Sequence, residues 1–338
     1  MFRIFGVTLR CSTNAFGMIY LNENDILTAV STEEMIDAIE SVLKAYENKD
    51  FHMPRRFHLD YGPNTVLLMP CFFQDYFCTK LISLFPHNPQ KNLPVLNGIV
   101  VLHDAQTGMP LALLDGPTVT AYRTAAVSSV SIRHLAPKDS NSLGIIGAGV
   151  QAFYQAWAAC TAHPFSEIWI YDVQPEQTDR TIKRLHTILK HVLFFPAENV
   201  QELLKNTQVV ITSTTSDEPV LPEQSELLAG KHYACIGSYK PHSRELPQAI
   251  YGLIHQITID AEEAVEESGD IITPLEHQWI RRDQITTLGR YLLDNSRDQD
   301  REETTVFKSV GIALFDLCAS KLIFENALEK GIGQKIER

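Results

Sequence analysis

The chain has 338 residues, of which 44% are hydrophobic and 21% charged, and it carries a formal net charge of −12 at pH 7. These values predict an ordinary soluble globular protein with room for two domains. The acidic balance argues against a nucleic-acid partner and against a basic membrane-binding face, and no apolar run is long enough to span a bilayer. Its six cysteines lack CxxC spacing. We therefore expect reduced thiols in a cytoplasmic protein, and no metal site.

The first third of the chain has the pattern of a small sheet with one helix. Residues 1–17 show little pattern, and we expect a loose extension there, with Met18 as an alternative start. Residues 19–21 are typical of a short strand, and 31–34 have the spacing of a capping box that begins a helix running to about Asn48. Further strands are predicted at 65–69, 76–84, 98–104 and 110–114. Because no helices intervene, these strands predict an antiparallel or mixed sheet of their own.

The second half alternates strands with helices. A long helix is predicted over 118–135, and six strands are expected at 143–146, 168–171, 192–195, 209–212, 233–236 and 257–259. This alternation predicts the α/β class: a Rossmann doubly wound parallel sheet plus a second α+β domain. Residues 304 to about 328 have an apolar stripe at helical spacing, so we expect a helix that packs back on the first domain. The stripe consists of Phe307, Val310, Leu314 and Leu317.

A glycine-rich turn follows the first of these six strands. Residues 147–152, Gly-Ala-Gly-Val-Gln-Ala, match the G-x-G-x-x-G/A pattern that opens a helix and holds a pyrophosphate at the helix start. About twenty residues later the next predicted strand ends in Asp172, where an acid accepts hydrogen bonds from the adenosine ribose. A 2′-phosphate would be repelled there, and the next residues offer no cation, which favours NAD over NADP. The alternative is a βα unit with no ligand.

Two cations lie in apolar surroundings in the first domain. Lys80 lies within a predicted strand, and Arg123 within the predicted helix 118–135. A buried cation is unfavourable unless it is paired, so an anionic ligand would explain both. The alternatives are an outward-facing strand position for Lys80 and a salt bridge from Arg123 to an acid such as Asp115. Hydroxyl-rich stretches at 211–215 and 237–239 are expected to border the dinucleotide, or else to cap turns and helices.

Several blocks together resemble the ornithine cyclodeaminase/μ-crystallin family, from about Ile19 to Leu328. They are Lys80 with Phe-Pro-His-Asn-Pro at 85–89, Leu-Asp-Gly at 114–116, Thr-Ala-Tyr-Arg-Thr-Ala-Ala at 120–126, Gly-Ala-Gly-Val-Gln at 147–151, and Thr-Val-Phe-Lys-Ser-Val-Gly at 305–311. The resemblance implies a homodimer and a nicotinamide held close to the α-carbon of a small amino or imino acid. It also implies a substrate and dimerisation domain at 1–130 with 309–338, and a Rossmann domain at 131–308.

The resemblance also assigns roles to residues by position. Arg56, Lys80 and Arg123 would hold the substrate carboxylate, with Lys80 serving proton transfer and Arg55 able to replace Arg56 after a one-residue slip. The residues expected to bind the cofactor are Arg123, Gly147, Ala148, Gly149, Val150, Gln151, Asp172, Thr214 and Ser309, the last two near the nicotinamide. Ornithine cyclodeaminases have an acid shortly after the fifth strand, where this chain has Tyr239 followed by Lys240.

Three functions follow from these observations. The first is an NAD(P)-dependent oxidoreductase that moves a hydride to or from the α-carbon of a small imino or amino acid, like a ketimine reductase, a Δ1-pyrroline-2-carboxylate reductase or an alanine dehydrogenase. The second is ornithine cyclodeamination to proline and ammonia, which Tyr239 disfavours because it replaces the expected carboxylate. The third is a ligand-binding protein of the crystallin type that keeps the cofactor without turnover, which the presence of both Lys80 and Arg123 disfavours.

Overall fold

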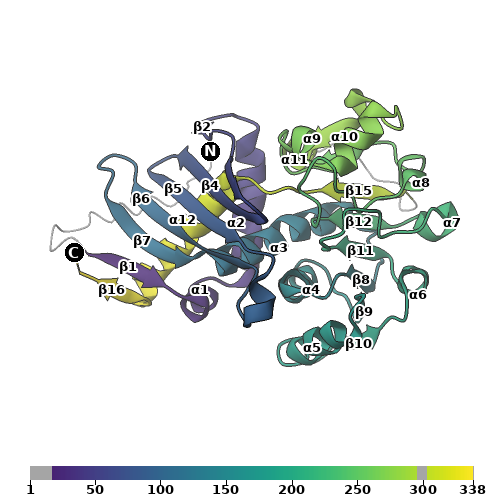
Figure 1. Ribbon diagram of the computed structural model, residues 1–338, viewed down its shortest axis with the longest axis horizontal. Coiled ribbons are helices and arrows are strands. Elements are labelled where there is room, and N and C mark those ends of the chain that lie inside the picture. The colour runs from purple at the N-terminus through teal and green to yellow at the C-terminus, as the bar shows by residue number, and fades with distance from the viewer. Residues whose placement is uncertain (1–16, 295–302, 338) are drawn as a thin grey trace.

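The computed structural model describes residues 17–294 and 303–337, and these form two eight-stranded sheets that lie side by side (Figure 1). The first sheet is mixed, in the order β16-β1-β7-β6-β5-β4-β2, with β3 also paired to β4. Its strands are β1 (Met18–Leu21), β2 (Phe51–His52), β3 (Phe57–Tyr61), β4 (Asn64–Phe73), β5 (Tyr76–Leu84), β6 (Leu96–Asp104), β7 (Pro110–Asp115) and β16 (Gln334–Ile336). The loose extension expected at 1–17 lies outside the described residues, apart from Gly17.

The second sheet is parallel throughout, in the order β10-β9-β8-β11-β12-β15-β13-β14. Its strands are β8 (Ser142–Ile146), β9 (Glu167–Tyr171), β10 (Leu193–Pro196), β11 (Val209–Thr212), β12 (His232–Cys235), β13 (Ile257–Ile259), β14 (Ile285–Thr287) and β15 (Thr305–Lys308). All six predicted strands are present, with β14 and β15 added. The predicted α/β class with a parallel sheet is confirmed.

Helices cover both sheets (Figure 1). Those that contact the first sheet are α1 (Glu23–Ala29), α3 (Gly116–Leu135) and α12 (Ala313–Lys330), and α2 (Thr32–Tyr46) packs on α3 and α12. Those within the second half are α4 (Val150–Ala162), α5 (Pro175–Leu185), α6 (Val200–Asn206), α7 (Ser225–Leu228), α8 (Gln248–Tyr251), α9 (Ala264–Glu267), α10 (Gly269–Glu276) and α11 (Leu288–Leu293). Short 3₁₀ turns, η1 (Asn88–Lys91) and η2 (Arg282–Gln284), complete the set. Helix α3 also packs on α4, so it joins the two halves.

The prediction of a single helix over 304–328 is wrong for the first residues of that range. Residues Thr305–Lys308 form β15, which is inserted between β12 and β13, and the helix begins only at Ala313. A central strand of a parallel sheet is buried on both faces, so its apolar run has no two-residue period that would distinguish it from a helix. The positive φ of Gly311 (+69°) lies between the strand and the helix.

The register of the first sheet decides which way Lys80 points. Lys80 is directly opposite Met69 on β4 and Val100 on β6, and all three side chains are buried on the face that packs against α12. The next row, which includes Phe57 and Leu81, lies on the outer face. Because neighbouring residues of a strand alternate between faces, a slip of one residue would expose Lys80. The outward-facing alternative for Lys80 is therefore excluded.

The predicted capping box at the start of α2 is confirmed. The Glu34 backbone N–H donates to Ser31 Oγ at 3.3 Å, and the Ser31 N–H donates to Glu34 Oε2 at 2.8 Å. The buried face of α2, which includes Met35 and Ile39, thereby begins at a fixed residue.

Replacing this cap should destabilise the protein without changing its site. We expect Ser31→Ala to lower the free energy of unfolding by about 1 kcal/mol, because one orphan N–H group at the helix start loses its acceptor. The matched control is Ser41→Ala on the same helix, where the hydroxyl donates only to the Asp37 carbonyl at 2.9 Å. Urea denaturation followed by circular dichroism measures both variants, and equal losses would contradict the capping role.

Candidate active site

Lys80 and Arg123 converge on a buried acid that sequence reasoning missed. Lys80 Nζ lies 2.6 Å from Asp316 Oδ2, and Arg123 Nε donates to Asp316 Oδ1 at 2.9 Å. The side chains come from β5, α3 and α12, and all three residues are buried. The partner of Arg123 is thus Asp316 and not Asp115. The signal that revealed Lys80, a charge among apolar residues, was also present at Asp316, which lies between Phe315 and Leu317.

The start of α3 is built to place Arg123. Asp115 accepts hydrogen bonds from the Thr118 N–H at 2.9 Å and from the Thr118 hydroxyl at 2.6 Å, so it caps the helix. The helix begins at Gly116, where an added Cβ would lie 2.7 Å from the backbone of Gly98 on β6. The Asp-Gly pair therefore lets α3 start in contact with the sheet, and Arg123 follows two turns later.

The charged groups of this cluster shift one another's pKa values. Burial lowers the pKa of Lys80 to about 8; Asp316 opposes this shift and Arg123 adds to it. Burial alone would raise the pKa of Asp316, but the adjacent Arg123 and Lys80 outweigh burial and hold that pKa below its usual value. Lys80 can therefore gain or lose a proton near neutral pH, while Asp316 stays ionised.

Arg56 reaches the same region from the loop before β3. Its Nη2 donates to the Gly311 carbonyl at 2.6 Å and lies 2.8 Å from Glu267 Oε2. Arg55 instead forms an exposed ion pair with Glu266, so Arg56 is the arginine directed inward. Gly311 also touches Arg123, because a Cβ there would lie 2.5 Å from Arg123 Nη1. Arg56, Lys80 and Arg123 are thus brought together around Gly311 and Asp316.

A small cavity of about 20 Å³ adjoins this cluster. Arg56 lines it, and so does Met69, the direct cross-strand neighbour of Lys80. The other lining residues are Met53, Pro54, Arg55, Glu263, Glu267, Ile312 and Ala313. The cavity is therefore apolar on the side of the first sheet and α12, with carboxylates on the side of α9.

The glycine-rich turn has the geometry that a dinucleotide needs. Gly147 has a φ of +95°, and a Cβ there would lie 2.8 Å from the Ser213 carbonyl oxygen, whereas nothing lies within 4 Å of the Cβ position of Gly149. Val150, the first residue of α4, is exposed. Asp172 accepts hydrogen bonds from the Ala148 N–H at 2.7 Å and the Gln174 N–H at 2.9 Å. The space beside Gly149 is thus open at the carboxyl edge of the sheet.

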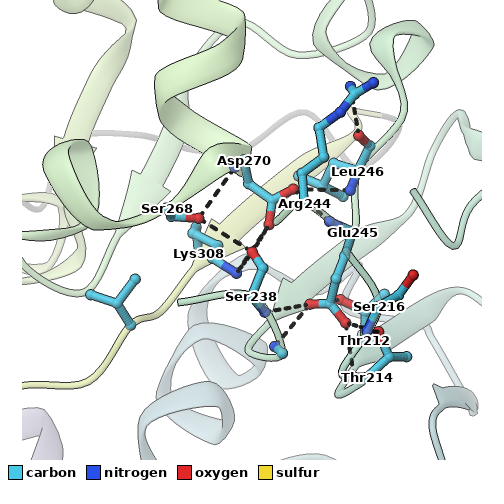
Figure 2. Close-up of polar contacts among 12 residues, drawn as sticks. Thr212, Thr214, Ser216, Ser238, Arg244, Glu245, Leu246, Ser268, Asp270 and Lys308 are labelled. Atoms are coloured by element: carbon cyan, nitrogen blue, oxygen red, sulfur yellow. Dashed lines mark hydrogen bonds and ion pairs between the residues drawn. The ribbon is translucent and has the colours of Figure 1, made fainter. Parts of the chain in front are cut away.

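Two hydroxyls expected near the nicotinamide already donate their protons within the protein. The Thr214 hydroxyl donates to Glu245 Oε1 at 2.9 Å, and the Ser309 hydroxyl donates to Asp260 Oδ2 at 2.6 Å. Glu245 also accepts from the Thr212 hydroxyl at 2.8 Å and the Gly237 N–H at 2.8 Å, which joins the loops after β11 and β12 (Figure 2). Thr214 and Ser309 both lie at the carboxyl edge of the parallel sheet, as predicted. Their hydroxyls can only accept hydrogen bonds from a ligand, because their protons are already donated within the protein.

A second buried ion pair supports the loop that carries Tyr239. Lys308 Nζ lies 3.0 Å from Asp270 Oδ2 and donates to Ser238 Oγ at 2.8 Å (Figure 2). Tyr239 follows directly and is half-buried. Burial raises the pKa of Tyr239, and the nearby charge of Arg56 opposes that shift. Tyr239 is therefore near enough to Arg56 for the two groups to interact electrostatically.

Within residues 17–294 and 303–337, every helix is too short or too polar to cross a membrane. The same residues contain no group of three or more histidine, cysteine, aspartate or glutamate side chains that could hold a metal ion.

Known proteins share this architecture along nearly the whole chain. The model of the ornithine cyclodeaminase/mu-crystallin family matches residues 18–331. The chain is 32% identical over 330 residues to the Δ1-pyrroline-2-carboxylate reductase of Bacillus thuringiensis subsp. konkukian (strain 97-27), which covers 95% of this chain and 100% of the relative.

Solved structures agree with this match. The Δ1-pyrroline-2-carboxylate reductase of Thermococcus litoralis, in complex with NADH and L-proline, has a TM-score of 0.88 at 31% identity, with 94% of this chain and 100% of that chain covered. An archaeal alanine dehydrogenase dimer with bound NAD has a TM-score of 0.86 at 27% identity, with 95% and 99% covered. The resemblance inferred from the motifs is confirmed, and the chain belongs to the ornithine cyclodeaminase/mu-crystallin family.

Proposed function

We propose that the protein is an NAD-dependent oxidoreductase that transfers a hydride to the α-carbon of a small imino acid, or from that of the corresponding amino acid. The observation that carries this proposal is the position of Gly311. It follows β15 at the carboxyl edge of the parallel sheet and contacts both Arg123 and Arg56. Three strand spacings, roughly 14 Å, separate β15 from the glycine-rich turn after β8. A dinucleotide bound at that turn would extend along this edge toward the cations.

Each cation has a distinct role in this mechanism. Arg56 and Arg123 bind the substrate carboxylate, since guanidinium groups recognise carboxylates by paired hydrogen bonds. Lys80, in its ammonium form, keeps the imine nitrogen protonated, which makes the imine carbon electrophilic. NADH, when bound, supplies the hydride that this carbon accepts. Fixing the carboxylate and the nitrogen together orients the carbon, and orientation supplies much of the rate.

Lys80 should therefore be required for turnover but not for cofactor binding. We expect Lys80→Met to lower kcat/KM by about a hundredfold to ten-thousandfold, the range for loss of a general acid–base group. Wild-type kcat/KM should fall as the pH rises through about 8, where Lys80 loses its proton. Steady-state NADH absorbance measures both effects, and fluorescence titration measures NADH affinity. Lys91→Met removes an exposed lysine as control; full activity in the Lys80 variant would refute the assignment.

Asp172 supports the choice of NAD over NADP. It lies at the end of β9, its carboxylate faces the glycine-rich turn through Ala148, and an anion there would repel a 2′-phosphate. Asp172→Ala should weaken NADH binding by about tenfold to a hundredfold, the loss expected for hydrogen bonds to a charged group. NADPH binding should weaken less or improve. Calorimetry on Asp172→Ala and on the exposed control Asp179→Ala tests this, and equal weakening of both cofactors would sink the preference.

The cavity indicates the substrate side chain. Met53, Met69 and Ala313 give it apolar surface, and on its charged side Arg56 is paired with Glu267. Methionine side chains adapt to irregular apolar shapes, and the chain is similar to Δ1-pyrroline-2-carboxylate reductases, whose substrate is a cyclic imino acid. We infer that the preferred substrates are cyclic imino acids with one carboxylate, such as Δ1-pyrroline-2-carboxylate.

A substrate panel tests the function as a whole. NADH consumption is compared for five- and six-membered cyclic imino acids and for pyruvate with ammonium, and ornithine is tested with NAD. We expect kcat/KM for the cyclic imines to exceed that for pyruvate with ammonium by about tenfold or more, from the added apolar contact. Proline formed from ornithine without net NADH change would instead identify a cyclodeaminase. Cofactor binding without any turnover would identify a ligand-binding protein.

We also propose a homodimer formed through the outer face of the first sheet. Phe57, Leu81 and Ile99 lie in one row across β3, β5 and β6 on that face, and they are 58%, 38% and 37% exposed. Leu59 and Tyr61 continue the apolar surface along β3. A contiguous apolar face of this kind is typical of a subunit interface, and a second copy of the same sheet complements it.

A further inference from the structure

We propose that Asp316 is a positioning residue that keeps Lys80 charged and fixes Lys80 and Arg123 at the substrate site. The proposal rests on the proposed function, because it assigns a role to a third residue at the same site. Arg56 lines the cavity, whereas Asp316, Lys80 and Arg123 are not among its lining residues. Asp316 acts through the two cations that lie between it and the ligand.

The geometry gives each carboxylate oxygen of Asp316 its own cation. Oδ2 lies 2.6 Å from Lys80 Nζ, and Oδ1 lies 2.9 Å from Arg123 Nε. Because the Nε edge of Arg123 faces Asp316, its terminal nitrogens extend past it, and both lie within 3 Å of the Cβ position of Gly311. The guanidinium therefore keeps its far end for another partner, and its rotation is fixed by the buried acid.

The local environment explains why Lys80 needs this partner. Lys80 is 2% exposed, and Arg123 and Arg56 both disfavour its charged form. Burial and two like charges act in the same direction, toward a neutral amine. Asp316 is fully buried and supplies the opposing attraction at the shortest distance in the cluster. Without it, Lys80 would be neutral at physiological pH and unable to protonate an imine.

The position of Asp316 in the fold also places its carboxylate close to residues that line the cavity. It lies in the first turn of α12, three residues after Ala313, which lines the cavity with Ile312. Lys80 lies beside Met69, which lines the cavity from the opposite element. The ion pair therefore holds α12 and β5 together behind the cavity, and any shift of α12 would move the ammonium group.

The Lys308–Asp270 pair offers a matched comparison. Both of its residues are 0% exposed and 3.0 Å apart, and Lys308 is also held by Ser238. This pair supports the loop after β12 and does not touch Lys80. Removing the charge of Asp270 should therefore destabilise the protein without moving the titration of Lys80.

The pH profile of kcat/KM separates positioning from mere structural support. In the wild type, kcat/KM should fall at alkaline pH with a midpoint near 8, and we call this fall the alkaline limb. In Asp316→Asn its midpoint should move below pH 7. The smaller protonated fraction of Lys80 then lowers kcat/KM at pH 8 by about fivefold or more. Asp270→Asn should keep its limb near 8. An Asp316→Asn enzyme that is slower but has an unmoved limb would overturn the proposal.

A conservative variant, Asp316→Glu, keeps the proposal testable if Asp316→Asn does not fold. Asp316→Glu keeps the charge but displaces the carboxylate, so its limb should stay near pH 8 while kcat falls by about tenfold or more from the loss of orientation. A glutamate variant with wild-type kcat would show that the position of the anion is immaterial. A glutamate variant whose limb moves below 7 would show that the charge is not what holds Lys80.

A second readout does not depend on turnover. Cyanate carbamoylates only the neutral amine, so the rate of Lys80 labelling against pH, measured by peptide mass spectrometry on the full chain, gives the pKa of Lys80 directly. Labelling should begin at least about one pH unit lower in Asp316→Asn than in the wild type. Identical labelling profiles in the two proteins would refute the proposal. If the wild type reduces no imino acid, the proposed function fails while this labelling still decides the role of Asp316.

Discussion

The ionic contact of Asp316 with Lys80 and Arg123 is the constraint on which the site depends. Burying three charges in an apolar interior is unfavourable unless each is paired, and removing one member leaves the others uncompensated. The three side chains come from a strand, a middle helix and the last helix of the described chain. Their pairing therefore requires β5, α3 and α12 to pack in one arrangement. The same contact that organises the first half of the molecule also holds Lys80 beside Met69, which lines the cavity, and Arg123 beside Gly311.

The segment between β15 and α12 carries this arrangement across to the parallel sheet. Asp260, at the end of β13, accepts hydrogen bonds from the Ser309 hydroxyl at 2.6 Å and from the Gly311 N–H at 2.7 Å. The positive φ of Gly311 and its contact with Arg123 leave no room for a side chain there. The path of the chain from one sheet to the other, visible in Figure 1, is thus fixed by an acid on one side and by a cation on the other.

The features that could be predicted from the sequence were local ones. The glycine-rich turn, the acid at Asp172 and the unusual cations Lys80 and Arg123 each stand out within a few residues of chain, and so did the six alternating strands. Asp316 carries the same local signal, but its pairing with the two cations could not be found in this way, because Asp316 lies 193 residues from Arg123. Nor could the insertion of β15 between β12 and β13, since a doubly buried strand has no periodicity of its own. Long-range pairing is decided by packing, and a single sequence does not display it.

The buried acids also explain how a protein with a net charge of −12 can hold the three cations Arg56, Lys80 and Arg123 at one site. Charges on the surface are screened by salt over about 8 Å at physiological ionic strength, so the overall acidity hardly opposes an anionic ligand at close range. Glu245 and Asp260 hold the loops after β11, β12 and β15 by accepting the protons of Thr214 and Ser309. Those loops therefore contribute a rigid frame and oxygen lone pairs, and the positive charge near the site comes from Arg56, Lys80 and Arg123. Because Asp316 lies behind two of these cations, it holds them in place without presenting its own charge to a bound carboxylate.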